Sequence, residues 1–234
     1  MAKRSYLALC VSTQMEKWPL SEIAFHCLTD SKRFPRSRSK ERIEYLAEKW
    51  NQCHEVGLQL FPNATHVINV GSYYLSQTSS LRRLINRYDQ LDCNIILSGN
   101  VWARLDRVLP YKTTYDTWGY PDLEGLSWRL RRPHGLLQVT SVAMPCIYPV
   151  ESWLQHRFHN PANVDDGIWY NTFCNESGLP VVVDLSIDFY RSKHDSDIVG
   201  LPFGKRLRIA FGVRKRLRNR FSKPRADYPG MHPA

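Results

Sequence analysis

The sequence of 234 residues has no long hydrophobic run. A membrane-spanning helix needs about 20 consecutive apolar residues, and no stretch here approaches that length. The first residues, MAKRSYLALCVST, combine basic residues with a short apolar run, but they lack the length and the cleavage site of a secretory signal peptide. We therefore expect neither a spanning helix nor a cleaved leader.

The sequence also lacks any CxxC pair. Its six cysteines are scattered, most of them in apolar, strand-like contexts: Cys10, Cys27, Cys53, Cys93, Cys146 and Cys174. Common zinc motifs need paired spacing, so a zinc site is not expected. The pattern instead predicts buried free thiols in a reducing compartment.

Acidic residues are nearly absent from residues 199–234, which hold ten Lys or Arg and a single carboxylate, Asp227. Removing these from the totals of 32 basic and 22 acidic residues leaves 22 basic and 21 acidic in residues 1–198. Nearly all of the net charge of +10 thus belongs to the tail, which carries +9. We divide the chain into a domain, residues 1–198, and a basic tail, residues 199–234.

The tail has the pattern of an amphipathic helix. Within residues 201–221, Leu207, Phe211, Leu217 and Phe221 recur near helical spacing, and Lys and Arg fill the other face. This is typical of a helix on a membrane surface. We expect the tail to bind an anionic membrane surface, which would make the protein cytoplasmic and peripheral at the membrane. Nucleic acid is the competing partner, and no base-reading module is recognisable to support it.

The domain is expected to be α/β, with a Rossmann-like, mostly parallel sheet flanked by helices. Buried strands are predicted at residues 6–11, 66–70, 94–97 and 181–187, and helices at 40–60 and 80–91. Residues 23–29 fit a second strand or a short helix equally well. Residues 135–150 are strand-like but must bend or end at Pro145 and Pro149.

The stretch FPNATHVINVGSYY, residues 61–74, is the centre of this pattern. A turn precedes a β-branched strand, which Gly71 and Ser72 break before the next helix. Ligands of open α/β sheets bind beyond the carboxyl ends of the strands. The loop at residues 69–74 is therefore predicted to face a ligand; the alternative is an ordinary strand-to-helix turn.

Together with RIEYLAEKWN, residues 42–51, this stretch resembles GT-A-fold glycosyltransferases of the family-2-like and capsule mannosyltransferase-like groups. The resemblance covers residues 42–191. It implies donor binding by Gly71, Ser72 and Tyr73, which stand where the family has the metal-binding Asp-x-Asp. Both carboxylates of that motif are absent here, so the motif is degenerate.

The family uses Mn²⁺ or Mg²⁺, and the degenerate motif bears on that cofactor. Hard divalent cations in nucleotide sites prefer carboxylate oxygens, and the loop offers a hydroxyl and a phenol. We therefore predict weak or no metal dependence and assign no metal site. His194, which falls near a metal-binding His of the family, is the candidate ligand otherwise, with Asp106 and Asp116.

The resemblance extends to VDDGIWYN, residues 164–171, which opens a helix running to about Cys174. It implies that Asp166 is the general base and Asp165 its partner. The acidic pair and the Gly71 loop are then expected to meet at one cleft. The alternative is a pair of carboxylates that only cap a helix. Family strands that end in Asp-Ser hold the nucleoside, which implies that role for Asp30; a helix N-cap explains Asp30 equally well.

Two further segments carry candidate binding residues. The loop YDTWGYPDLEG, residues 115–125, places Trp118 and Tyr120 where aromatic rings would stack on an acceptor sugar, and Trp169 is assigned the same role. A surface excursion packed by its own aromatics is the alternative. The basic loop at residues 32–42 either offsets diphosphate charge or is a solvated surface.

The resemblance implies transfer of a sugar from a nucleotide-sugar donor to a glycan or lipid-linked acceptor at a membrane surface. Two other functions remain open. The degenerate motif allows a non-catalytic GT-A-like protein that binds sugar or nucleotide. The basic tail allows a nucleic-acid-associated protein.

Overall fold

The structure is a computed structural model that describes residues 4–30, 40–91, 93–104, 112–114, 135–139, 141–142, 144–159 and 169–191. Its strands are β1 (Tyr6–Ser12), β2 (Ala24–Thr29), β3 (His66–Asn69), β4 (Ile96–Arg104), β5 (Lys112–Thr114), β6 (Leu136–Val139), β7 (Cys146–Pro149) and β8 (Val181–Arg191). Its helices are α1 (Lys40–Leu60), α2 (Thr78–Leu91), α3 (Val150–Gln155) and α4 (Trp169–Glu176), with a 3-10 turn, η1 (Ser72–Tyr74). None of the helices in these ranges is long and apolar enough to cross a bilayer.

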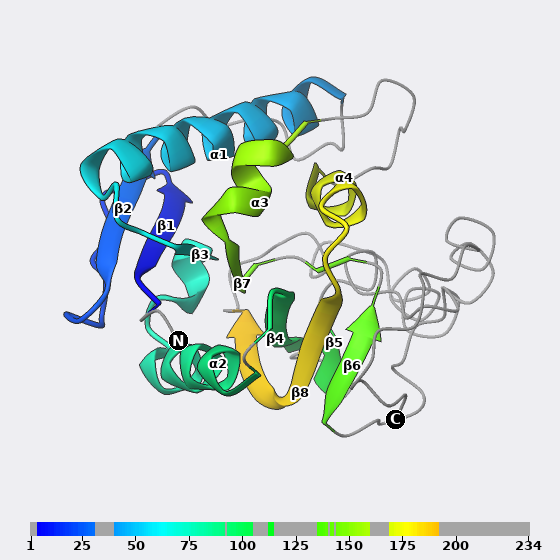
Figure 1. Cartoon of the computed structure of the whole chain (residues 1–234). Helices are drawn as coiled ribbons and strands as arrows, with labels where there is room; N and C mark the ends of the chain where they lie inside the picture. The colour runs from blue at the N-terminus through cyan, green and yellow to red at the C-terminus, as the bar shows by residue number, and fades with distance from the viewer. Residues whose placement is uncertain are drawn as a thin grey trace, which may run out of the picture.

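The strands form one mixed sheet in the order β2-β1-β3-β7-β4-β8-β6, and β5 pairs with β4 (Figure 1). β1 is parallel to both β2 and β3, and β4 is parallel to β8. β7 is antiparallel to β3 and to β4, so the two parallel blocks run in the same direction. The carboxyl ends of five strands therefore lie at one edge. The predicted α/β class is therefore confirmed, and so is a mostly parallel arrangement in the core of this mixed sheet.

Helices cover both faces of the sheet: α1, α3 and α4 lie on one side and α2 on the other (Figure 1). Successive strand residues point to opposite faces. Leu7 and Leu9 of β1 meet α1 at Gly57, where an added Cβ would lie 2.6 Å from the Leu9 side chain. Tyr6 packs edge-on against Tyr88 of α2. The glycine thus allows α1 to approach the sheet closely.

Each predicted strand exists, but most bounds differ. β1 is one residue longer than expected and β3 one residue shorter, while β4 begins at Ile96 and runs on to Arg104. β8 continues past Ile187 to Arg191 because its partner β4 continues beside it. Residues 24–29 form a strand, which settles the ambiguity of that segment.

The segment at residues 135–150 was predicted to be strand-like and to bend or end at Pro145 and Pro149, and it holds two separate strands, β6 and β7. They pair with different partners, β6 with β8 and β7 with β3 and β4. Pro149 is the last residue of β7, and α3 begins at Val150. The two prolines therefore mark a strand start and a strand end, since Pro145 directly precedes β7.

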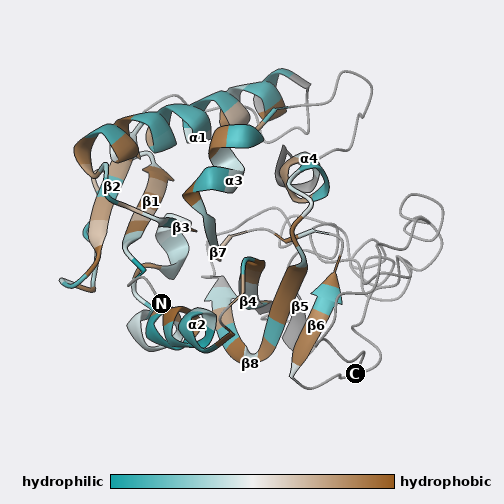
Figure 2. Ribbon diagram, viewed as in Figure 1, coloured by the Kyte–Doolittle hydropathy of each residue, from teal (hydrophilic) through white to brown (hydrophobic). Residues whose placement is uncertain are grey.

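The core is continuous across the sheet, and hydrophobic stretches of the strands face it while α1 and α2 are largely hydrophilic on their outer sides (Figure 2). All six cysteines are free thiols, as predicted; five are buried and Cys93 is half-buried. The basic tail and most of the basic loop lie outside the described residues.

Candidate functional site at the carboxyl edge of the sheet

Asp30 stands directly after β2, at the edge where the parallel strands end. Its backbone N–H donates to the carbonyl of Ser12, the last residue of β1, at 2.8 Å. Its carboxylate accepts a hydrogen bond from the Tyr45 hydroxyl and lies 3.4 Å from the ammonium of Lys49. Both partners project from α1, four residues apart, as neighbours on one helix face. The Asp30 side chain keeps 20% of its surface exposed, so a ligand can reach it.

Tyr45 is a donor to this carboxylate over a wide pH range. Burial, and then the hydrogen bond to Asp30, raise the pKa of Tyr45 to about 12. The phenol thus remains protonated and orients one side of the carboxylate. Neither Tyr45 nor Lys49 was singled out from the sequence. Their spacing places them on one face of α1, which the sequence does show. Only the packing of α1 against β2 shows that this face meets Asp30.

The turn after β3 lies at the same edge. Gly71 is extended, with φ −76° and ψ 147°, a conformation open to any residue. Its carbonyl accepts from the backbone N–H of Tyr74 at 2.9 Å, which closes η1. Ser72 is half-buried, and Tyr73 is 45% exposed. The strand, break and turn follow the predicted order, and donor binding by these three residues stays a prediction.

A chain of buried hydrogen bonds links the end of β3 to β7 and α1. Asn69 Nδ2 donates to the Tyr148 hydroxyl at 2.6 Å. His54 Nδ1 donates to the carbonyl of Trp50 at 2.7 Å, which leaves Nε2 as the acceptor for the Tyr148 hydroxyl, also at 2.7 Å. Burial lowers the pKa of His54 to about 3, so the neutral ring is the stable form. The turn at Gly71 therefore starts from a rigid base.

The other half of the edge is formed by β4 and β8. Their register shifts between Gly99 and Asn100, and Asn100 then pairs with Asp188. The Asn100 amide donates to the Asp188 carboxylate at 3.4 Å, and the Tyr190 hydroxyl approaches the second carboxylate oxygen at 3.4 Å. Asn100 is buried, and Tyr190 is 42% exposed. No local sequence pattern indicates this group.

Gln77 joins the two halves of the edge. Its amide donates to the carbonyl of Tyr190 at 2.6 Å and to that of Tyr73 at 3.3 Å. Its side-chain oxygen accepts from the backbone N–H of Tyr190 at 2.8 Å. One side chain before α2 thus sets the distance between the turn after β3 and the end of β8.

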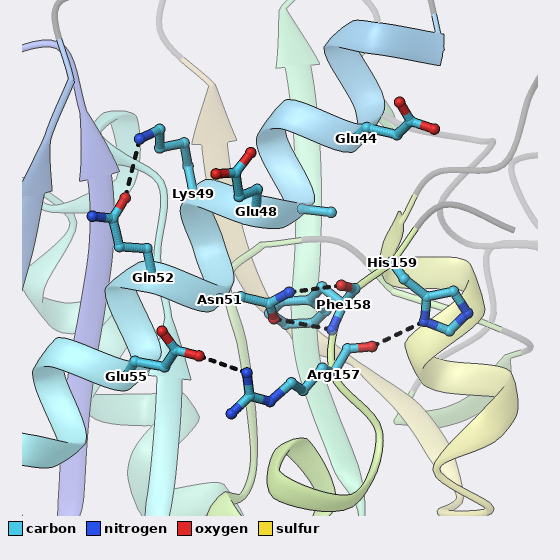
Figure 3. A pocket seen from close by; sticks show the side chains of 10 residues that line it. Glu44, Glu48, Lys49, Asn51, Gln52, Glu55, Arg157, Phe158 and His159 are labelled. Atoms are coloured by element: carbon cyan, nitrogen blue, oxygen red, sulfur yellow. Dashed lines mark hydrogen bonds and ion pairs between the residues drawn. The ribbon is translucent and has the colours of Figure 1, made fainter.

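A separate groove of about 750 Å³ lies between α1 and residues 157–159 (Figure 3). Asn51 bonds both the backbone N–H and the carbonyl of Phe158, and Arg157 pairs with Glu55 at 2.6 Å. Lys49 lies between this groove and Asp30. Of the predicted site residues that the structure describes, none lines this groove.

The structure describes four of the predicted site residues: Asp30, Gly71, Ser72 and Tyr73. Trp169 is the first residue of α4, and its side chain is outside the description. The remaining predicted residues also lie outside the described residues: Asp106, Asp116, Trp118, Tyr120, Asp165, Asp166 and His194. The expected meeting of the Gly71 loop with the acidic pair at one cleft therefore stays a prediction.

Comparisons with known proteins give no family assignment. No protein-family model matches the chain, and no curated protein matches it. Among solved structures, A197 from STIV aligns over 78% of this chain and 82% of its own, with a TM-score of 0.45 and 10% identity. S. aureus TarS 1-349, a glycosyltransferase, aligns over 80% of this chain with a TM-score of 0.42 and 12% identity. The alignment spans only 60% of that TarS chain. TM-scores this low identify no activity.

Proposed function

We propose that the protein is a glycosyltransferase that moves a sugar from a nucleotide-sugar donor to a glycan or lipid-linked acceptor. The observation that carries the proposal is Asp30, an accessible carboxylate at the carboxyl end of a parallel strand, held by Tyr45 and Lys49. In doubly wound sheets, ligands bind at this edge, and a strand-end carboxylate hydrogen-bonds a ribose hydroxyl. The sequence resemblance assigns the nucleoside to the same residue.

Donor binding would use charge as well as hydrogen bonds. The Asp30 carboxylate would accept from a ribose hydroxyl or a base N–H, and Lys49, 3.4 Å away, would stand near the negative donor. Ser72, at the turn after β3, would contribute its hydroxyl. Basic residues of the 32–42 loop would offset the diphosphate.

The chemical step would be a direct displacement. Asp166, assigned by the resemblance, would accept the proton of the acceptor hydroxyl as general base, with Asp165 beside it. The acceptor oxygen would then bond to the anomeric carbon while the bond from that carbon to the donor phosphate breaks. The nucleotide, a diphosphate from UDP- or GDP-sugars and a monophosphate from CMP-sugars, would leave with the electron pair.

Mn²⁺ or Mg²⁺, which the family uses, does not fit the donor atoms of the described turn. Gly71, Ser72 and Tyr73 supply no carboxylate, and these cations prefer carboxylate oxygens. Within the described ranges, no group of three or more His, Cys, Asp or Glu could hold a metal ion. We route no step through a metal and expect weak or no dependence on Mn²⁺.

The tail would bring the domain to an anionic membrane surface, in keeping with its ten basic residues and single carboxylate. Full-length protein should sediment with anionic vesicles and be released as salt screens the charge. Protein ending at residue 198 should stay in the supernatant. Equal partitioning of the two would contradict the role of the tail, and preference for RNA over anionic lipid would favour the nucleic-acid function.

A screen of donor turnover tests the proposed activity. UDP-, GDP- and CMP-sugars would be incubated with the protein, with and without Mn²⁺, and release of nucleotide measured. We expect hydrolysis or transfer with one nucleotide class, reduced by about 10²- to 10⁴-fold in Asp166→Asn. Binding without turnover in any condition would indicate the non-catalytic sugar- or nucleotide-binding protein instead.

A further inference from the structure

Asn100 contains a buried polar atom that the fold leaves unused. The side chain is only 3% exposed, and its Oδ1 has no hydrogen-bond partner in the described part of the chain. The orientation of the amide is fixed, because Nδ2 faces the Asp188 carboxylate, which can only accept. A buried oxygen without a donor costs about 1–3 kcal/mol, so its presence requires an explanation.

The position of Asn100 connects it to the carboxyl edge of the sheet. Ser98 pairs with Cys146, so Asn100 and Tyr148, each two residues farther along, share one face of the sheet. Asp188, the register partner of Asn100, lies on that face as well. This is the face covered by α3 and α4, where Tyr148 packs against Phe173. The turn at residues 71–74 lies at the same edge.

One exposed aromatic residue contacts this polar pair, and a second is tied to the same glutamine, Gln77. Tyr190 lies two residues after Asp188 on the same face. The residue is 42% exposed, although Gln77 binds both its backbone N–H and its carbonyl. Tyr73, 45% exposed, is tied to the same glutamine through its carbonyl. Rings that are exposed on a fixed backbone are suited to contact a ligand at little cost in ordering.

We propose that Asn100, Asp188 and Tyr190 form a subsite for a saccharide ring, with Tyr73 at its border. A sugar hydroxyl donates to Asn100 Oδ1, the planar amide and carboxylate bind hydroxyls, and the tyrosine ring packs on the apolar face of the sugar. The inference rests on the proposed function, because it assigns the sugar of the donor or of the acceptor to this place.

Two variants separate binding from folding. Tyr190→Ala removes the ring but keeps the backbone that Gln77 holds, and Asn100→Leu replaces the buried amide by an apolar side chain of similar size. Asn100→Leu also removes the unpaired oxygen, so the free energy of unfolding should stay within experimental error or rise, while sugar binding falls. Leu154→Ala, at an exposed position of α3, is the matched control.

Saturation-transfer NMR would measure binding of glucose, galactose, mannose and N-acetylglucosamine, of an oligosaccharide of each, of their nucleotide conjugates, and of UDP and GDP alone. We expect both variants to bind sugar-containing ligands about three- to tenfold more weakly than wild type and to bind UDP or GDP with unchanged affinity. Weaker binding of the nucleotide sugar would assign the subsite to the sugar of the donor. Weaker binding of the oligosaccharide alone would assign it to the sugar of the acceptor.

The remaining outcomes distinguish the two proposals. Unchanged binding of every sugar-containing ligand in both variants overturns the subsite and leaves the transferase proposal standing. If the wild-type protein binds sugars but no nucleotide, and both variants bind the sugars more weakly, the subsite is supported and the transferase proposal is overturned. A wild-type protein that binds neither sugar nor nucleotide overturns both.

Discussion

The hydroxyl of Tyr148 lies 2.7 Å from Nε2 of His54, in the layer between β7 and α1. The same hydroxyl accepts from Asn69 at 2.6 Å, so the last residue of β3 is linked to α1 through two buried side chains. The imidazole also stacks on Trp153, with ring centroids 4.7 Å apart. This contact holds the strand that precedes the Gly71 turn, and it makes the fold sensitive to acid.

We predict a loss of stability with falling pH that depends on His54. Its pKa is about 3 in the folded protein and about 6.5 when unfolded, so its contribution is complete above pH 6.5 and is lost as the pH falls toward 3. Urea unfolding should show wild type losing up to about 1.4 kcal/mol per pH unit relative to His54→Gln in this window. His66 and the carboxylates titrate in both proteins, so parallel curves for the two would contradict the assignment.

Asp184 is buried beside Arg87, with 3.0 Å between the carboxylate and Nε. Arg87→Met should therefore destabilise the protein by about 1–3 kcal/mol, less than for a fully buried pair because Arg87 is partly exposed and Ser186 still donates to the carboxylate. Arg82→Met, on the same helix, breaks only an exposed pair with Glu22 and should change stability by less than about 0.5 kcal/mol. Equal effects in denaturant unfolding would refute this assignment.

Gly99 lies where β4 and β8 shift register, and the space above it is filled. An added Cβ would be 2.6 Å from the Phe189 ring and 2.8 Å from the Ile187 carbonyl. Gly99→Ala should lower the thermal midpoint by several degrees, because backbone must move. Gly71→Ala is the control, since its nearest contact would be 3.4 Å, and it should fold with nearly unchanged stability. Tolerance of both substitutions would show that the bulge is not tightly packed.

The sequence was sufficient for the elements whose signals are local. The β-branched run THVINV predicted β3, and the break at Gly71 predicted the turn that follows it. Asp30 was singled out through the resemblance, in which a strand ends in Asp-Ser, but the local pattern left residues 23–29 open between strand and helix. Buried free thiols followed from apolar context.

The group around Asn100 could not be found from sequence, because its members meet only through strand pairing. Asn100 and Asp188 are 88 positions apart and face each other after a register shift that no local pattern encodes. β7 was missed as a separate strand since it has four residues and ends in proline. Gln77 contacts Tyr190 across 113 positions, which only the packing of α2 beside β8 reveals.

We propose that a nucleotide sugar binds where β1 and β2 end, and titration calorimetry with Asp30→Asn is the sharpest test of this binding. Asn keeps the shape of the side chain but loses the charge beside Lys49, and Glu151→Gln, on an exposed face of α3, is the control. We expect wild type and Glu151→Gln to bind the same UDP-, GDP- or CMP-sugar equally, and Asp30→Asn to bind it at least about tenfold more weakly at unchanged thermal stability. Equal affinity in all three proteins, or no binding by wild type, would contradict it.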